Sequence, residues 1–282
     1  MVSAYWVRVL DGGREVPADR SLADLTTELT QMLGDADPRV REEVATPTLT
    51  TWIRRGEYDD LLSGLGDGMA AGLRVGLGEP TGDAVFRRAC SARVLAACID
   101  RDTERPLVLG GRVLDWGDRI ATWLLEEQDL RAFVPAKGWA HALARAADAL
   151  GSLAGSPHVG KAELAVLLDV IGERLAVRTD VALTHGETDR LAAAAMAILR
   201  RDRVSIETLE PWVGRLGEAA RHRALEGDPY LATANAEAFL RALYLQLALG
   251  TRRAPAVRAD LLLLLVDVLR DTNRAYLRDP GH

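Results

Sequence analysis

The sequence predicts an all-α protein, an irregular stack of about eleven helices, and three observations support this fold class. Apolar residues recur at helical spacing along nearly all of the 282 residues. Gly, Pro and Asp interrupt the pattern at fairly regular intervals, and no segment shows the alternation expected of a β-strand. Hydrophobic residues make up 48% of the chain but aromatic residues only 5%, so Leu, Ala and Val must fill the core, as in close-packed helices.

The Gly, Pro and Asp residues that interrupt the helical pattern predict the helix boundaries. A short helix or turn is expected at “AYWVRVL”, residues 4–10. Asp37 before Pro38 predicts a helix start, because Asp caps free N–H groups and proline suits the first helical position. Pro47 should kink or split that helix, because proline removes a helical hydrogen bond. The expected helices span residues 21–33, 38–54, 58–75, 83–101, 112–127, 138–154, 161–177, 187–201, 205–223, 230–249 and 256–276.

Helical segments joined by short loops are typical of successive αα-hairpins. The stretch “DPRVREEVATPTLTTWI”, residues 37–53, resembles the first helix of a HEAT-type repeat. Stacked hairpins of this kind share a core and form a curved solenoid with a concave face. Because no clean self-similarity recurs at a fixed period, an irregular helical bundle is the alternative. We expect residues 1–282 to form a single all-helical domain of elongated shape.

The charge balance argues against nucleic acid as a partner. The net charge is −6, whereas nucleic-acid binders place many Lys and Arg side chains against phosphates. Two basic clusters, “RRDR” at 200–203 and “RR” at 252–253, lie where helices should end, and cations at that end favour the helix dipole.

Cysteine usage and hydropathy predict a cytoplasmic protein without a membrane segment. Cys90 and Cys98 fall in one expected helix, which places them about 12 Å apart and excludes a disulfide between them. Two unpaired thiols are typical of a reducing compartment, and the N-terminus has neither the basic nor the apolar region of a signal peptide. The longest apolar run, “LLLLLV” at 261–266, is far too short to span a bilayer.

Several short motifs imitate cofactor sites without completing them. “GSPHVGKA”, Gly155–Ala162, has the spacing of a phosphate-binding loop. However, Ala162 replaces the hydroxyl residue of that motif, and an expected helix precedes it where the motif requires a strand. We therefore interpret the stretch as a loop between helices. “GDGMAA”, Gly66–Ala71, is better explained by a glycine-rich helix that allows close packing. “HGE” at 185–187 lacks the cysteines of a zinc deaminase. The sequence therefore predicts neither a cofactor nor a metal site.

The strongest candidate site lies in “KGWAHALARAADALGSLA”, residues 137–154. His141, Arg145 and Asp148 stand at positions i, i+4 and i+7, which would place them on one helix face. Lys137 and Trp139 lie at the N-terminal end of that helix, where backbone N–H groups can receive an anion. A functional interpretation gives His141 an acid–base or hydrogen-bonding role, with Arg145 as an anion clamp and Asp148 orienting it. The structural alternative is an interhelical polar network, with an ordinary ion pair of Arg145 and Asp148.

Two other polar clusters stand out. Arg87 and Arg88 lie side by side in an otherwise apolar helix, so at least one must leave the core or find a carboxylate. “GETDRLA” at 186–192 places Glu187 and Asp189 in the first turn of a helix, where acidic residues are favoured by the dipole, and structural capping is the simpler explanation.

Four stretches in order resemble a bacterial family known as domain of unknown function 2785: “DADPRVREEVATPTLTTWIRRGEYDDLL”, “DAVFRRACSARVLAACIDRD”, “LLEEQDLRAFVPAKGWAHALARAADALGSLA” and “GETDRLAAAAMAILRR”. The resemblance covers about residues 20–205 and implies a helical, HEAT-like fold in a bacterial protein. It departs at Arg145, where the family usually has a second histidine, and this argues against a two-histidine scheme. The family motifs fall on Arg87, Asp129, Arg131, Lys137, Gly138, Trp139, His141, Asp148, Glu187, Asp189 and Arg190.

Three functions compete at this point. The first is a binding scaffold whose polar concave face, with Trp139, His141 and Arg145, holds a peptide, a small acidic ligand or a protein partner. The second is an enzyme, a cyclase, lyase or hydrolase of a peptide or secondary-metabolite pathway, with His141 and Asp148 as catalytic candidates. The third, a sensor of DNA lesions, requires a basic face that the acidic composition disfavours.

Overall fold

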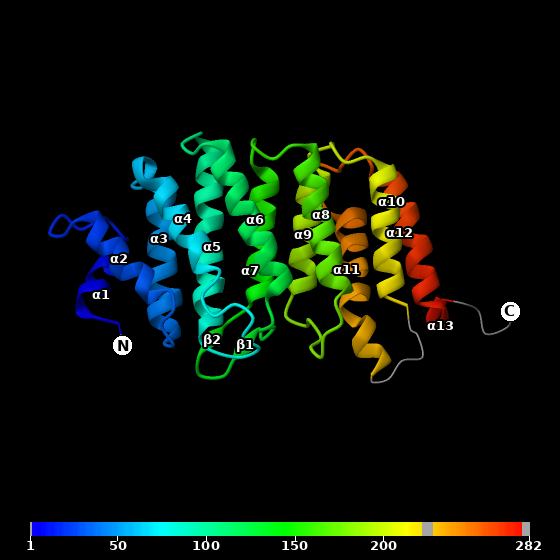
Figure 1. Ribbon diagram of the computed structural model, residues 1–282, viewed down its shortest axis with the longest axis horizontal. Helices are drawn as coiled ribbons and strands as arrows, with labels where there is room; N and C mark the ends of the chain where they lie inside the picture. Colours follow the sequence, from blue (N-terminus) through cyan, green and yellow to red (C-terminus); the bar gives the residue numbers. More distant parts are fainter. Residues whose placement is uncertain (1, 222–227, 278–282) are drawn as a thin grey trace. The chain divides into compact units, whose positions relative to one another are not determined.

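The computed structural model describes residues 2–221 and 228–277, in which thirteen α-helices contain most of the chain (Figure 1). The predicted all-α class is confirmed. The chain divides into two compact units, residues 1–158 and 159–282. The single elongated domain and the curved solenoid remain predictions.

The first unit holds seven α-helices in its described residues. Helices two apart in sequence pack against each other, α3 on α5 and α5 on α7, while α4 packs on α5 and α6 and thereby covers one side of this row (Figure 1). Successive helices thus alternate between two layers, as the αα-hairpin interpretation predicts. The helices are α1 (Ala4–Asp11), α2 (Leu22–Met32), α3 (Thr46–Arg55), α4 (Leu62–Gly72), α5 (Ala84–Glu104), α6 (Gly110–Glu126) and α7 (Ala142–Gly155).

The second unit repeats this alternation. Helix α10 packs on both α8 and α12, and α9 packs on α11. The predicted helix at 256–276 is interrupted at Asn273, and the last two residues of the predicted helix at 205–223 lie outside the described residues. The helices are α8 (Lys161–Ala176), α9 (Glu187–Leu199), α10 (Ile206–Ala219), α11 (Pro229–Leu249), α12 (Arg258–Thr272) and α13 (Arg274–Leu277).

The segment around Pro47 is split, as predicted. Residues Arg39–Ala45 form a π-helical turn, η1, and Pro47 lies in the first turn of α3. Proline has no N–H for the carbonyl of Glu43, and that carbonyl accepts a hydrogen bond from Arg14 instead, at 3.2 Å. The Thr46 N–H reaches back to the Arg41 carbonyl, which makes the turn one residue wider than an α-helix.

Two sequence motifs have the structural roles expected of them. Gly66, in “GDGMAA”, lies in α4 against the indole of Trp116, which would come within 2.2 Å of a Cβ at that position. The motif is therefore a close-packing device. “GSPHVGKA” connects the end of α7 at Gly155 to the start of α8 at Lys161, without a strand before it.

The expectation of no strand was wrong at one place. Phe133–Val134 (β1) and Gly138–Trp139 (β2) pair antiparallel to form a short hairpin between α6 and α7. The predicted helix at 138–154 consequently begins later, at Ala142. Positive φ angles at Ala136, Gly138 and His141 (65°, 80° and 50°) prevent the helix from extending further toward the N-terminus.

Candidate functional site

The hairpin runs from Arg131 to His141 and carries most of the predicted site residues. The Lys137 N–H closes its turn on the Val134 carbonyl at 3.0 Å, and Pro135 stands at the turn position that its fixed φ suits. Two further backbone bonds extend the pairing beyond the strands, from Ala140 N–H to the Ala132 carbonyl at 2.8 Å and from His141 N–H to the Arg131 carbonyl at 3.1 Å.

Hydrogen bonds of three cationic side chains join the hairpin to η1 and to the residues that precede α5. Arg131 donates to the Gly82 carbonyl at 2.7 Å. Lys137 binds the Asp83 carboxylate at 2.7 Å. From η1, the fully buried Arg41 donates to the Lys137 carbonyl at 2.6 Å. Arg131 and Lys137, both predicted site residues, therefore position the hairpin.

Asp129 also belongs to this anchoring network. It is fully buried and binds Arg131 through both carboxylate oxygens, at 2.7 and 2.5 Å. Its backbone N–H donates to Glu127 at 3.0 Å. Glu127 in turn binds Arg88 through both oxygens, at 2.6 and 2.7 Å. The predicted carboxylate for the arginine pair on α5 is thus Glu127.

Three rings form a row on the hairpin. Phe133 and Trp139 are cross-strand partners whose ring centroids lie 5.2 Å apart, nearly edge to face. The indole of Trp139 lies over the imidazole of His141 at 5.0 Å, with 31° between the planes. Phe133 and Trp139 are 52% and 40% exposed, whereas His141 is buried. The exposed rings of Phe133 and Trp139 are therefore available to a ligand, and the buried ring of His141 stacks against Trp139.

His141 lies at the N-terminal end of the helix and not within it, as its spacing had assumed. It is the N-cap of α7, in the left-handed region at φ 50°, which is uncommon for a residue with a side chain. Its carbonyl accepts the Arg145 N–H at 3.1 Å, so Arg145 stands one turn further along. We call Phe133, Trp139 and His141 the hairpin face.

Arg145 and Asp148 form the ion pair that the structural interpretation predicted, with 3.4 Å between their nearest atoms. Both are only partly exposed, at 21% and 36%. Arg93 on α5 also lies near this pair. Desolvation and then the charge of Arg145 lower the pKa of Arg93. Arg93 itself forms no ion pair or hydrogen bond within the part of the chain that the structure describes.

Arg87 lies elsewhere in the first unit. Its guanidinium donates to the Thr30 carbonyl of α2, and its aliphatic stem packs near Gly34. Burial lowers the pKa of Arg87. These contacts give it a role in joining α5 to α2.

Glu187, Asp189 and Arg190 belong to the second unit. Glu187 is buried at the start of α9 and accepts the His185 N–H at 2.7 Å, which agrees with structural capping. Asp189 is exposed, and its carbonyl accepts Gln246 Nε2 at 2.8 Å. Arg190 is half-buried, and its N–H donates to the Gly186 carbonyl.

Sequence reasoning missed Phe133, Arg41 and Arg93. Phe133 could have been predicted from “VPAKG”, the proline-containing turn signal that separates it from Trp139. Arg41 and Arg93 gave no local signal, because their roles depend on residues far away in the chain.

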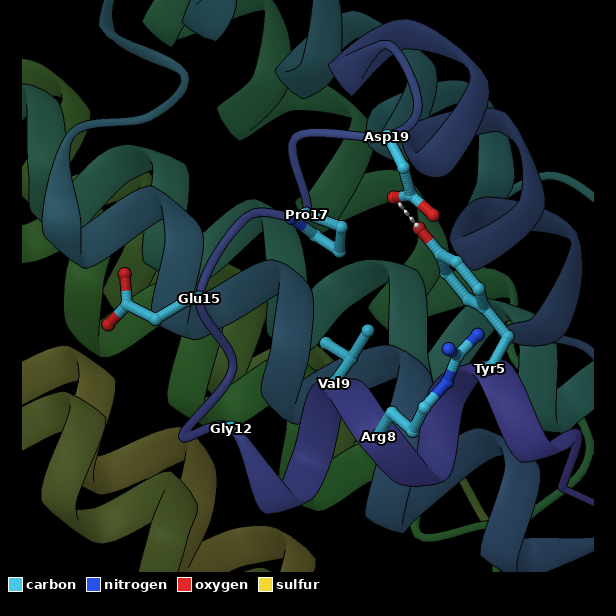
Figure 2. A pocket seen from close by; sticks show the side chains of 7 residues that line it. All are labelled: Tyr5, Arg8, Val9, Gly12, Glu15, Pro17 and Asp19. Carbon is cyan, nitrogen blue, oxygen red and sulfur yellow. Dashed lines mark hydrogen bonds between the residues drawn. The ribbon is translucent and has the colours of Figure 1, made fainter.

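A surface pocket of about 240 Å³ lies beside α1 (Figure 2). The Tyr5 hydroxyl donates to Asp19 at 3.1 Å, and the Arg8 guanidinium lies 5.7 Å from the Tyr5 ring centre. These polar groups engage one another, and we assign this pocket no function. Its lining residues are Tyr5, Arg8, Val9, Gly12, Glu15, Pro17 and Asp19.

Within residues 2–221 and 228–277, the His, Cys, Asp and Glu side chains form no group of three that could hold a metal ion. No helix in these ranges combines the length and the apolar character needed to cross a membrane.

Comparison with known proteins gives one match. The sequence model of a family described as protein of unknown function (DUF2785) matches residues 73–245, more than half of the chain. No curated protein and no solved structure matches. The matched range contains every predicted site residue of both units.

Proposed function

The chain belongs to the DUF2785 family of proteins of unknown function, and we propose that it is a HEAT-like helical binding scaffold. In this proposal the hairpin face holds a peptide, a small acidic ligand or a protein partner. The protein acts in the bacterial cytoplasm, without nucleic acid or membrane as partner.

One observation carries the proposal. The chain has six tryptophans and three phenylalanines, and all of them except Trp139 and Phe133 are at most 1% exposed. The two exceptions are paired across the hairpin. Exposed aromatic pairs are typical of binding hot spots, since large rigid rings gain contact area at a small entropy cost.

The anchoring of the hairpin supports a binding role. A ligand that packs on a loose loop must first order it, whereas a fixed hairpin presents its rings without that cost. Arg131, Lys137 and Arg41 each hold the hairpin by a bond of 2.6 to 2.7 Å. The face is therefore preorganised.

The position of His141 favours this role over acid–base catalysis. Its imidazole is 7% exposed and lies against the indole of Trp139. A general base must come within hydrogen-bond reach of the proton that it removes. Because so little of His141 is exposed, its ring is better suited to supporting Trp139 than to meeting a substrate.

Retention of short random peptides on an array tests the proposal. We expect the wild-type protein to retain a defined subset and Trp139→Ala to bind that subset about tenfold more weakly, the equivalent of about 1.4 kcal/mol. Leu109→Ala is the matched control, because Leu109 is an exposed apolar residue of the same unit, 84% exposed. An array on which wild type and Trp139→Ala retain the same peptides equally would disprove the assigned face.

A further inference from the structure

Two arginine-rich loops meet at one end of the second unit. One loop joins α9 to α10, and the other joins α11 to α12 (Figure 1). Arg200 Nε donates to the Arg253 carbonyl at 3.1 Å, and the Asp202 carboxylate accepts the Ala256 N–H at 2.7 Å. Asp202 also forms an ion pair with the Arg253 guanidinium. These bonds hold the two loops side by side.

The two loops and the first turns of the helices that follow them concentrate positive charge. Residues 200–207 and 251–260 contain six arginines and three acidic residues, whereas the whole chain has a net charge of −6. Of the three acidic residues, Asp202 is already engaged by Arg253 and by the Ala256 N–H. The region is therefore locally cationic on an acidic protein.

The arginines of the two loops repel one another. Burial, followed by the charge of Arg252, lowers the pKa of Arg200. Burial and then the charge of Arg203 lower the pKa of Arg201 in the same way. Like charges that lie close together disfavour each other's charged form. Because hydrogen bonds hold the loops together, an anion can relieve this repulsion where separation of the loops cannot.

The helix dipole accounts for only part of this group. Arg258 donates to the Leu247 and Ala248 carbonyls at 2.9 and 3.0 Å, and thereby caps the C-terminal end of α11. Arg203 and Arg252 lie beyond the ends of α9 and α11, whereas the dipole acts within the last turn. Both are exposed, and neither forms an ion pair or a hydrogen bond with the residues that the structure describes. Their charges are available to a ligand.

We propose that the two loops bind an acidic peptide segment of a partner protein. The contacts are the exposed arginines of the loops, Arg203, Arg252 and Arg253, and we call them the arginine patch. The three charges stand on separate residues of two loops, and carboxylates spaced along a peptide can pair with them one by one. This site lies on the second unit and does not depend on the hairpin face.

Two observations favour a peptide over nucleic acid. Residues 200–207 and 251–260 contain no aromatic residue, whereas proteins bind single strands by stacking the bases on aromatic rings. A long polyanion such as a duplex would also extend beyond the patch, and the net negative charge of the chain would repel it. A short acidic segment meets only the arginine patch.

Fluorescence anisotropy of the full chain with labelled, end-capped hexaglutamate tests the proposal. We expect binding at low ionic strength that weakens as added salt screens the exposed charges. The double variant Arg203→Gln with Arg252→Gln should bind hexaglutamate about tenfold more weakly. Because neither side chain bonds to another described residue, the variant should keep its fold, and circular dichroism checks this.

The double variant Arg178→Gln with Arg270→Gln is the matched control, because it removes the same charge from two exposed arginines of the same unit. Arg270 lies about 18 Å along α12 from Arg258, at 1.5 Å per residue. Arg178 follows the C-terminal end of α8, whereas the N-terminal end of α8 is the one next to Arg201. The control should bind hexaglutamate like the wild type. Equal weakening in both double variants would reduce the effect to overall charge and overturn the site.

Three further outcomes would overturn the proposal. A wild-type protein that does not bind hexaglutamate at low salt has no such site. Heptathymidylate carries the same number of negative charges, and tighter binding of this probe would assign the patch to nucleic acid. Trp139→Ala should bind hexaglutamate like the wild type, and a loss of binding in this variant would move the acidic ligand to the hairpin face.

Discussion

Arg88 and Glu127 show how a single pair of residues secures the base of the site. Both side chains are 1% exposed, and a charge buried so deeply is tolerated only with a partner and further hydrogen bonds. Arg88 also binds the carbonyls of Val75 and Gly76, each at 2.8 Å, and Glu127 accepts the Trp123 indole N–H at 2.7 Å. The pair thereby joins α5 to the segment that leads into the hairpin.

Removal of one member of the Arg88–Glu127 ion pair should destabilise the fold. We expect Arg88→Met to lower the free energy of unfolding by about 3 to 5 kcal/mol, because Glu127 would remain buried as an uncompensated charge. The double variant Arg88→Met with Glu127→Gln should recover part of this loss. Urea unfolding followed by circular dichroism measures both. A loss below about 1 kcal/mol in the single variant would mean that the pair contributes little to the fold.

At the scale of elements, the helices could be predicted and the hairpin could not. Helical periodicity is a local signal, and it placed α2, α5 and α8 to within three residues at each end. The hairpin depends on contacts with distant residues, since Arg41 reaches across 96 positions to the Lys137 carbonyl. The same holds for the site: Trp139, Arg145 and Asp148 were found in one stretch, whereas Arg93 is brought near Arg145 only by the packing of α5 on α7.

A substitution of Gly138 tests how the hairpin is held against Pro38 and Glu42. Its φ of +80° disfavours any side chain, and an added Cβ would lie 3.0 Å from Pro38 Cβ and 3.1 Å from Glu42 Oε1. We expect Gly138→Ala to loosen the hairpin by about 1 to 2 kcal/mol and to speed tryptic cleavage after Lys137 about tenfold. Gly155→Ala is the control, because its Cβ would meet nothing within 4 Å. Equal cleavage of both variants would show that the hairpin opens independently of this contact.

At the scale of the whole molecule, acid stability depends on how many carboxylates are held ionised. Hydrogen bonds from Arg101, followed by the charges of Arg101 and Arg105, lower the pKa of Asp59. Burial by itself raises the pKa of Glu28, but hydrogen bonds from Trp6 and Arg20 outweigh this effect and lower the pKa overall. Asp100 behaves oppositely, since desolvation raises its pKa.

The sign of the pH dependence follows from these directions. A carboxyl whose folded pKa is lowered stabilises the fold fully above its unfolded pKa, near 4 for Asp, and this contribution is lost as the pH falls through the folded value. A carboxyl with a raised pKa adds stability on acidification. Lowered carboxyls outnumber raised ones among the shifted groups, with Asp37 and Glu207 also lowered. The free energy of unfolding should therefore decrease below about pH 4.

Asp59 and Asp100 provide a matched pair of variants for this prediction. Asp59→Asn breaks bonds of 2.7 to 2.9 Å with Arg101 and Arg105, so it should cost about 1 to 2 kcal/mol at pH 7 and flatten the decline at acid pH. Asp100→Asn removes a group that opposes the decline and should steepen it. Denaturant unfolding from pH 3 to pH 7 measures the slopes. If Asp59→Asn kept the slope of the wild type, the acid sensitivity would have to arise from other carboxylates.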